Sequence, residues 1–172
     1  MKKIIGLVAS LTVIAGVCAA VLAFVNKLTA EPIAQMLVKK TQDAAKAVMP
    51  TAVKSVEQQG DLFVGKDSSG QIVGYAVKGS DAGGYGGDVV LMVGFEADKK
   101  TVVCYKTLSA AETPGLGMKL NTPEFADQFK GKNGTNLHVK KDGGEIEAIT
   151  SATITSRAVC KAIADAAGKL NS

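Results

Sequence analysis

Five hydroxyl side chains gather in a short segment just before the last predicted helix. They are Thr150, Ser151, Thr153, Thr155 and Ser156, with the small Ala152 among them. The simpler interpretation is N-capping, in which a Ser or Thr oxygen accepts a hydrogen bond from an unpaired backbone N–H. The second is phosphate binding, because a helix N-terminus offers several N–H donors and the positive end of the helix dipole. Capping needs only one hydroxyl, so both interpretations stay open.

Two glycine-rich segments are the other candidates for ligand contact. One runs from Gly83 to Asp88 with four glycines, and the other runs from Ala111 to Met118 around a Pro-Gly pair. The first lacks the third glycine and the following helix of a dinucleotide-binding fingerprint. The simplest interpretation of both is a turn or loop. The alternative is a close approach of the backbone to a flat ligand, with a carboxylate and a hydroxyl at Glu112 and Thr113 for hydrogen bonds.

Hydropathy and turn residues predict the elements that position these segments. Strands are expected over residues 61–64, 71–77, 89–95 and 101–105, the last two joined as a hairpin, with a further strand near 137–140. Helices are expected from Glu31-Pro32 to Met49-Pro50, over 123–129 with Thr122 as N-cap, and from about 153 to 170. The fold class is therefore α+β, with an antiparallel sheet flanked by helices.

The N-terminus has a different composition from the rest of the 172-residue chain. From Ile4 to Val25 there are 22 residues without a charge, which as a helix span about 33 Å and can cross a hydrocarbon core of roughly 30 Å. A cleaved signal peptide has a shorter apolar region of about 7–15 residues, so an uncleaved transmembrane helix is predicted. Lys2 and Lys3 precede it, which favours a cytoplasmic N-terminus.

This pattern predicts a single-pass protein of the cell (inner) membrane with three parts. Residues 1–26 would be the cytoplasmic N-terminus and transmembrane helix, 27–50 a connecting helix, and 51–172 a periplasmic or extracellular domain.

Charge and metal-binding residue types exclude other classes. The net charge of +4 falls to +2 once Lys2 and Lys3 are set aside, and the chain has one Arg and no Trp, which argues against nucleic-acid binding. His138 alternates with apolar neighbours and is expected on a strand surface; no metal site is expected. Cys104 and Cys160 are the two cysteines outside the apolar run, and buried free thiols are the favoured interpretation.

The three candidate segments together resemble those of a known family. Residues 147–153, from Glu147 to Thr153, resemble the flavinylation motif D-x-x-(S/T)-(G/S)-A-T of FMN-binding domains in ion-pumping respiratory complexes. Residues 112–117 and 84–86 resemble the family's other recurring segments, in the same order and spacing. From apolar run to last helix, the chain resembles the G subunit of the Rnf electron-transport complex, a relative of the C subunit of the sodium-pumping NADH:quinone oxidoreductase. Glu147 instead of Asp and Ser151 instead of the common Gly are two departures.

The resemblance implies that FMN is bound covalently to Thr153 through a phosphodiester. A separate flavin transferase would split FAD, leave FMN on the hydroxyl and release AMP. The other cofactor-binding residues expected are Tyr85, Glu112, Thr113, Leu116, Gly117, Ser151 and Ala152. No catalytic residue is expected, because the cofactor supplies the chemistry.

The resemblance also implies a role in electron transfer within a membrane complex. The complex would be an Rnf-type ferredoxin:NAD⁺ oxidoreductase coupled to Na⁺ or H⁺ translocation, and the partners would be its other subunits. One alternative is the related flavin subunit of a Na⁺-translocating NADH:quinone oxidoreductase, which is usually longer. Another is a membrane-tethered, non-redox binding domain whose hydroxyl-rich helix start is only a cap.

Overall fold

The computed structural model describes residues 2–171, with side chains from residue 4 onward. The chain forms two compact units, Met1–Lys40 and Thr41–Ser172. Helix α1, Lys2–Val48, begins in the first unit and ends in the second. The side chains of Lys2 and Lys3, on which the expected orientation depends, lie outside the described part. The expected divisions at residues 26 and 50 stay predictions.

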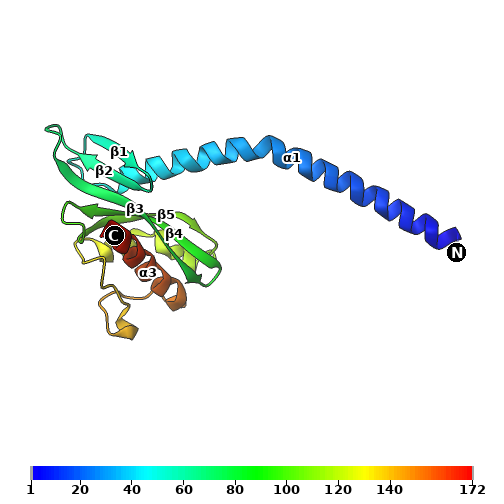
Figure 1. Cartoon of the computed structure of the whole chain (residues 1–172). Coiled ribbons are helices and arrows are strands. Elements are labelled where there is room, and N and C mark those ends of the chain that lie inside the picture. Colours follow the sequence, from blue (N-terminus) through cyan, green and yellow to red (C-terminus); the bar gives the residue numbers. More distant parts are fainter. Residues whose placement is uncertain (1, 172) are drawn as a thin grey trace. The chain divides into compact units, whose positions relative to one another are not determined.

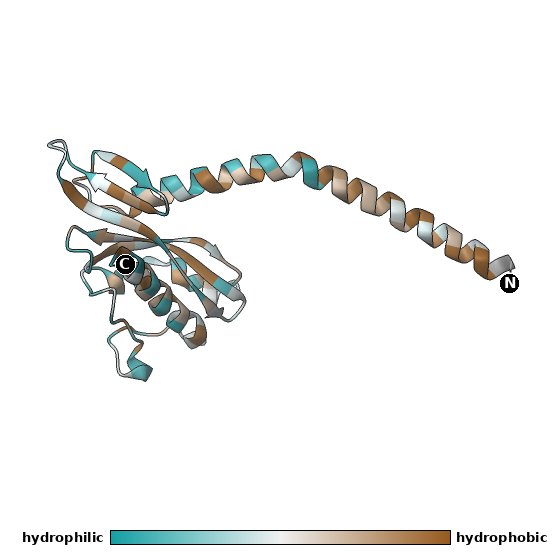
Figure 2. Cartoon of the chain, viewed as in Figure 1, coloured by the Kyte–Doolittle hydropathy of each residue, from teal (hydrophilic) through white to brown (hydrophobic). Residues whose placement is uncertain are grey.

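The first unit consists of the N-terminal part of α1. From Ile4 onward this helix is long and apolar enough to cross a membrane, and Figure 2 shows the hydrophobic colouring along its N-terminal stretch. Glu31-Pro32 is not a helix start, because α1 runs through Pro32 without ending, and the connecting helix continues directly from the apolar one. Proline removes one intrahelical hydrogen bond, but helical residues on both sides can maintain the helix across it.

The second unit is built on a five-stranded antiparallel sheet in the order β1-β2-β3-β4-β5 (Figure 1). The strands are β1 Ser55–Gln59, β2 Leu62–Lys66, β3 Ile72–Gly84, β4 Gly87–Glu96 and β5 Val102–Ala110. Each strand pairs with its neighbour in the sequence, so every connection within the sheet is a hairpin. The antiparallel sheet is confirmed, including the hairpin across residues 97–100. Strand β1 is absent from the expected elements, because its mostly polar residues show no apolar alternation and it lies at the sheet edge.

The two faces of the sheet are covered by different helices. On one face, Leu91 and Val93 belong to a core with α3, Thr153–Leu170, which contributes Ile163 and other buried residues. On the other face, Met92 packs in a second core with Val48 from the end of α1. Alternate residues of β4 therefore serve opposite cores, as the two-residue period of a strand requires. The predicted final helix matches α3 in both position and length.

Short helical turns connect β5 to α3. They are η1 Gly117–Asn121, α2 Pro123–Ala126, η2 Asp127–Phe129 and η3 Lys140–Asp142. The strand predicted near 137–140 is wrong: Val139 forms one isolated bridge to Ile146, and His138 is exposed on a loop. Buried Leu137 and Val139 alternate with exposed residues, as in a strand. The segment forms only this one bridge among the described residues, so the alternation reflects burial of a loop and not pairing in a sheet. Thr122 does occupy the predicted N-cap position of α2, but its hydroxyl donates to the Lys119 carbonyl and makes no capping hydrogen bond.

The cysteines are free thiols in the structure. Burial raises the pKa of the Cys160 thiol to about 12, and it also raises the pKa of the half-buried Cys104. Both thiols therefore stay protonated and unreactive at neutral pH, in agreement with their interpretation as small apolar side chains.

Candidate functional site

The predicted site residues line one cavity of about 510 Å³ in the second unit. This volume lies within the range of about 300–1,000 Å³ that is typical of small-molecule sites. The cavity is lined by all eight predicted residues: Tyr85, Glu112, Thr113, Leu116, Gly117, Ser151, Ala152 and Thr153. Ile154 and Thr155 complete the lining. Another cavity of about 500 Å³, around residues 131–138 and 143–146, includes none of the eight. Tertiary structure thus brings the three segments together at one place.

The first wall is the two-residue turn between β3 and β4. Gly84 pairs with Gly87 across this turn, which contains Tyr85 and Gly86. A Cβ atom at Gly86 would lie 1.6 Å from the Ala111 carbonyl oxygen, so a side chain there would push the turn away from the second segment. The Tyr85 side chain is 72% exposed, and its ring is free to cover a ligand at the cavity mouth.

Glu112 joins the three segments from inside. Its side chain is buried, one carboxylate oxygen accepts the Tyr85 backbone N–H at 2.9 Å, and the other accepts the Thr155 hydroxyl at 2.8 Å. A Cβ atom at Gly117 would lie 2.4 Å from the second oxygen, so glycine leaves the space that the carboxylate fills. Glu112 therefore holds the cavity walls together.

The start of α3 forms the opposite wall, and no hydroxyl caps it. Ala152 occupies the N-cap position without a side-chain cap, and the first intrahelical bond runs from Ser156 N–H to the Ala152 carbonyl. The Ser156 hydroxyl instead bonds Ile149 N–H and the Ala152 carbonyl, while the Thr155 hydroxyl bonds Glu112. The N-capping interpretation is therefore wrong. Within residues 2–171 the N–H groups of residues 153–155 have no partner, as expected for an uncapped helix start.

Ser151 has a backbone conformation that favours glycine. Its φ is +64°, one of two positive values among the described non-glycine residues. A side chain in this left-handed region is strained, whereas glycine adopts it freely. The departure from the family's common glycine therefore costs stability at the turn before Ala152.

We expect Ser151→Gly to raise the free energy of unfolding by about 0.5–1 kcal/mol, because relief of the strain exceeds the added backbone entropy of glycine. Urea unfolding of the full chain in detergent measures the change. Thr150→Gly is the matched control: Thr150 has no positive φ, so glycine there should destabilise the chain. A loss of stability in both variants would contradict the strain argument.

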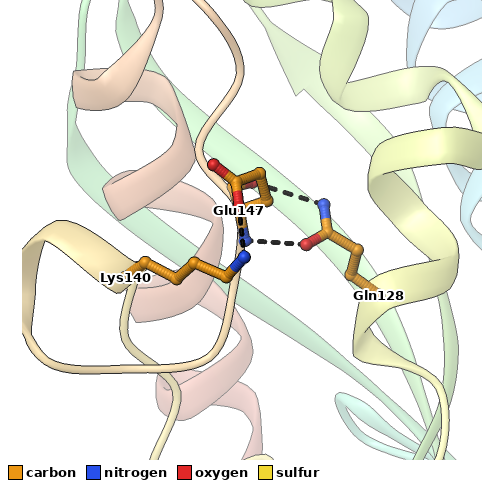
Figure 3. A network of polar contacts seen from close by, with 3 residues as sticks. All are labelled: Gln128, Lys140 and Glu147. Atoms are coloured by element: carbon orange, nitrogen blue, oxygen red, sulfur yellow. Dashed lines mark hydrogen bonds and ion pairs between the residues drawn. The ribbon is translucent and has the colours of Figure 1, made fainter.

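Glu147, the acid of the motif, lies outside the cavity. Figure 3 shows it between Lys140 and Gln128. Its carboxylate pairs with Lys140, its backbone N–H donates to the Gln128 side-chain oxygen at 2.7 Å, and its carbonyl accepts from Gln128 at 3.3 Å. These contacts fix the segment that leads into Ser151 against η2. Glu147 therefore helps to fix the position of the motif, and it is not among the residues that line the cavity.

Lys141 is a residue at the site that the sequence patterns do not reveal. Its ammonium group donates to the Thr153 hydroxyl oxygen at 3.3 Å. It belongs to η3, twelve residues before Thr153, and no local spacing rule links the two positions. Its neighbour Asp142 accepts two hydrogen bonds of 2.6 Å from Arg157, which lies one turn after Thr153 on α3.

The Asp142–Arg157 pair predicts a pH dependence of stability. Hydrogen bonds from Arg157 hold the pKa of the Asp142 carboxyl below its ordinary value of 3.8. The pair therefore stabilises the folded chain above pH 3.8, and this contribution is lost as the pH falls below that value. We expect Asp142→Asn to be less stable than wild type at neutral pH, with the difference shrinking in acid.

Urea midpoints measured across acidic and neutral pH test this expectation. Asp88→Asn is the control, because Asp88 is exposed and its side chain has no ion pair or hydrogen bond among the described residues. A constant difference between Asp142→Asn and wild type at every pH would show that charge pairing is not the cause.

Comparison with known proteins agrees with this geometry. Residues 84–168 match the model of the FMN-binding domain family. The chain is 32% identical to the G subunit of the ion-translocating oxidoreductase complex of Methanosarcina acetivorans, over 94% of this chain and 92% of that protein. It is 34% identical to the G subunit of the Na⁺-translocating ferredoxin:NAD⁺ oxidoreductase complex of Acetobacterium woodii, over 89% and 84% of the two chains.

A solved structure has a similar fold. The crystal structure of the C subunit of Na⁺-translocating NADH-quinone reductase from Parabacteroides distasonis is similar with a TM-score of 0.53 and 28% identity. This match covers 64% of the present chain and 62% of that one. By sequence over nearly its whole length, the present chain belongs to the family of G subunits of ion-translocating oxidoreductase complexes, and it contains that family's FMN-binding domain.

Proposed function

We propose that this chain is the flavin-carrying electron-transfer subunit of a membrane-bound Rnf-type complex, with FMN attached to Thr153 by a phosphodiester. The complex would be a ferredoxin:NAD⁺ oxidoreductase that couples redox chemistry to Na⁺ or H⁺ translocation. The observation that carries the proposal is the common cavity of Thr153 and the two glycine-rich segments, inside an FMN-binding domain. The related G subunits, matched over most of their length, support the assignment to the complex.

The residues around the cavity fit FMN. A phosphate would accept hydrogen bonds from the unpaired N–H groups of residues 153–155. The positive end of the α3 dipole would stabilise its negative charge. An isoalloxazine ring has apolar neighbours in Leu116 and Ile154 and an aromatic one in Tyr85. When bound, FMN accepts and releases electrons, and the protein supplies binding and orientation. No side chain of the cavity is then required to act as a catalyst.

The attachment requires a partner enzyme, a flavin transferase that uses FAD. A bond forms between Thr153 Oγ1 and the phosphorus of the FMN half. The pyrophosphate bond of FAD breaks, AMP leaves, and the hydroxyl proton is released. Thr153 is half-buried at the cavity wall, so its hydroxyl is accessible for this transfer.

We further propose a single-pass topology with the N-terminus in the cytoplasm and the FMN-binding domain in the periplasm or outside the cell. The long apolar helix and the family fit a membrane-anchored protein. The orientation rests on Lys2 and Lys3 before the apolar run. A covalent bond suits this location, because a flavin released outside the cytoplasm is not readily replaced.

The test is to express the full chain with its flavin transferase and examine a denaturing gel under ultraviolet light. Fluorescence at the position of the chain is expected. Mass spectrometry of the tryptic peptide from Asp142 to Arg157 should locate the FMN adduct on Thr153. A dark band at full expression would contradict covalent attachment and favour a non-redox, membrane-tethered binding domain.

A further inference from the structure

The ammonium group of Lys141 points at the hydroxyl oxygen that would carry the flavin. Its nitrogen is 3.3 Å from Thr153 Oγ1 and donates to it. A hydroxyl is a weak partner for an ammonium group, because it has only partial negative charge. A phosphodiester at the same oxygen has a full negative charge on its free oxygens, and hydrogen bonds between charged groups are about twice as strong as neutral ones.

Lys141 is held at this place by its surroundings. It lies in η3 between Lys140 and Asp142, and Asp142 is fixed to α3 by two hydrogen bonds from Arg157. Val139, just before η3, forms the bridge to Ile146. The backbone of Lys141 is thereby anchored to the same helix that begins with Thr153, so the side chain has a short, defined reach to the hydroxyl.

Three basic residues of the loops before α3 and of α3 itself already have acidic partners. Lys140 pairs with Glu147, as Figure 3 shows, Lys132 pairs with Glu145, and Arg157 pairs with Asp142. Lys141 has no ion pair with any carboxylate among the described side chains. One positive charge beside Thr153 is therefore left without an ion pair, and the nearby acidic residues Asp142, Glu145 and Glu147 pair with other cations.

We propose that Lys141 binds the phosphate of the flavin attached to Thr153 and neutralises its charge. The inference rests on the proposed function, since it requires FMN on this residue. Unpaired N–H groups of α3 would bind the phosphate from one side and Lys141 from the other. Because Lys141 is exposed, the ion pair is screened by salt and its contribution is moderate.

Lysine labelling of the full wild-type chain tests the contact directly. An amine-reactive acylating reagent is applied to the chain before and after flavin loading, and mass spectrometry measures the rate at each lysine. We expect loading to slow the reaction of Lys141 by about 3- to 10-fold and to leave that of Lys140 unchanged. Equal rates at Lys141 before and after loading would overturn the inference.

Three variants distinguish an effect of the Lys141 charge from simple coverage of the Lys141 side chain by the flavin. The melting temperature of each full chain is measured unloaded and loaded, and the two values are subtracted. We expect the increase in melting temperature on loading to be about 1–4 °C smaller in Lys141→Met than in wild type. At high salt the two increases should become equal. Lys141→Arg, which keeps the charge, and Lys140→Met, which removes the neighbouring one, should behave as wild type.

The two proposals fail in different ways. If wild type gains no covalent flavin, the proposed function is wrong and the phosphate proposed as the ligand of Lys141 does not exist. If wild type is loaded but Lys141→Met shows the wild-type change in melting temperature on loading, only the role of Lys141 is wrong. The same loss in Lys140→Met as in Lys141→Met would show a general effect of charge and would also overturn the inference.

Discussion

Thr153→Ala is expected to remove covalent flavin from the chain completely. The substitution deletes the oxygen to which the phosphorus would be bonded, and the two hydroxyls that follow it on α3 are not accessible in its place. The Thr155 and Ser156 hydroxyls are buried and bonded to Glu112 and to the backbone of residues 149 and 152. In-gel fluorescence of the full chain, expressed with the flavin transferase, measures the loss.

Thr150→Ala is the matched control for this experiment. Thr150 is an exposed hydroxyl residue three positions earlier in the same motif, and it is not part of the cavity lining. We expect this variant to be loaded with flavin. Fluorescence that persists in Thr153→Ala would show that another residue bears the flavin, and the mass of the labelled peptide would identify it.

Glu112→Ala is expected to give the largest loss of stability among the site variants, about 2–4 kcal/mol of the free energy of unfolding. It leaves the Tyr85 N–H and the Thr155 hydroxyl without their acceptors, and it empties the space beside Gly117. The Thr155 hydroxyl is buried and the Tyr85 N–H is part-buried, and donors removed from water are costly when they have no partner. Urea unfolding of the full chain in detergent measures the effect.

Two further variants show whether Glu112 acts through these contacts. Thr155→Val removes one donor, so the double variant Glu112→Ala with Thr155→Val should be more stable than the sum of the single losses predicts. Glu96→Ala is the control, because Glu96 is exposed and its side chain has no hydrogen bond or ion pair among the described residues. Equal losses in Glu96→Ala and Glu112→Ala would contradict the role of Glu112.

The strongest local patterns predict their elements correctly. Strand β4 follows from a short continuous apolar run, and helix α3 follows from apolar residues that repeat with the period of a helix; both elements lie in the core. The strand predicted over Leu137–Lys140 is wrong although its residues alternate with the period of a strand. A strand needs a neighbouring strand to pair with, and this segment forms one isolated bridge. Pro32 is typical of a helix start, but the surrounding helix continues through it.

The contents of the site are predictable from the sequence, but the roles of its residues are not. The motif at Thr153 and the two glycine-rich segments can be identified by residue type and order, since these are local properties of the chain. Whether a hydroxyl caps a helix or bonds elsewhere depends on what lies nearby in space. Thr155 bonds to Glu112, which is 43 residues away in the sequence, and no local rule predicts that contact.

By itself, the sequence determined that an apolar helix precedes a small α+β domain, and that a hydroxyl-rich helix start and two glycine-rich turns are its candidate ligand sites. Composition and periodicity suffice for this, because they reflect burial and backbone preference residue by residue. Only the tertiary structure decided that the three segments enclose one cavity, that Glu112 ties them together and that Lys141 reaches Thr153. These contacts join residues 12 to 43 positions apart, and their geometry is set by the packing of α3 and its loops on the sheet.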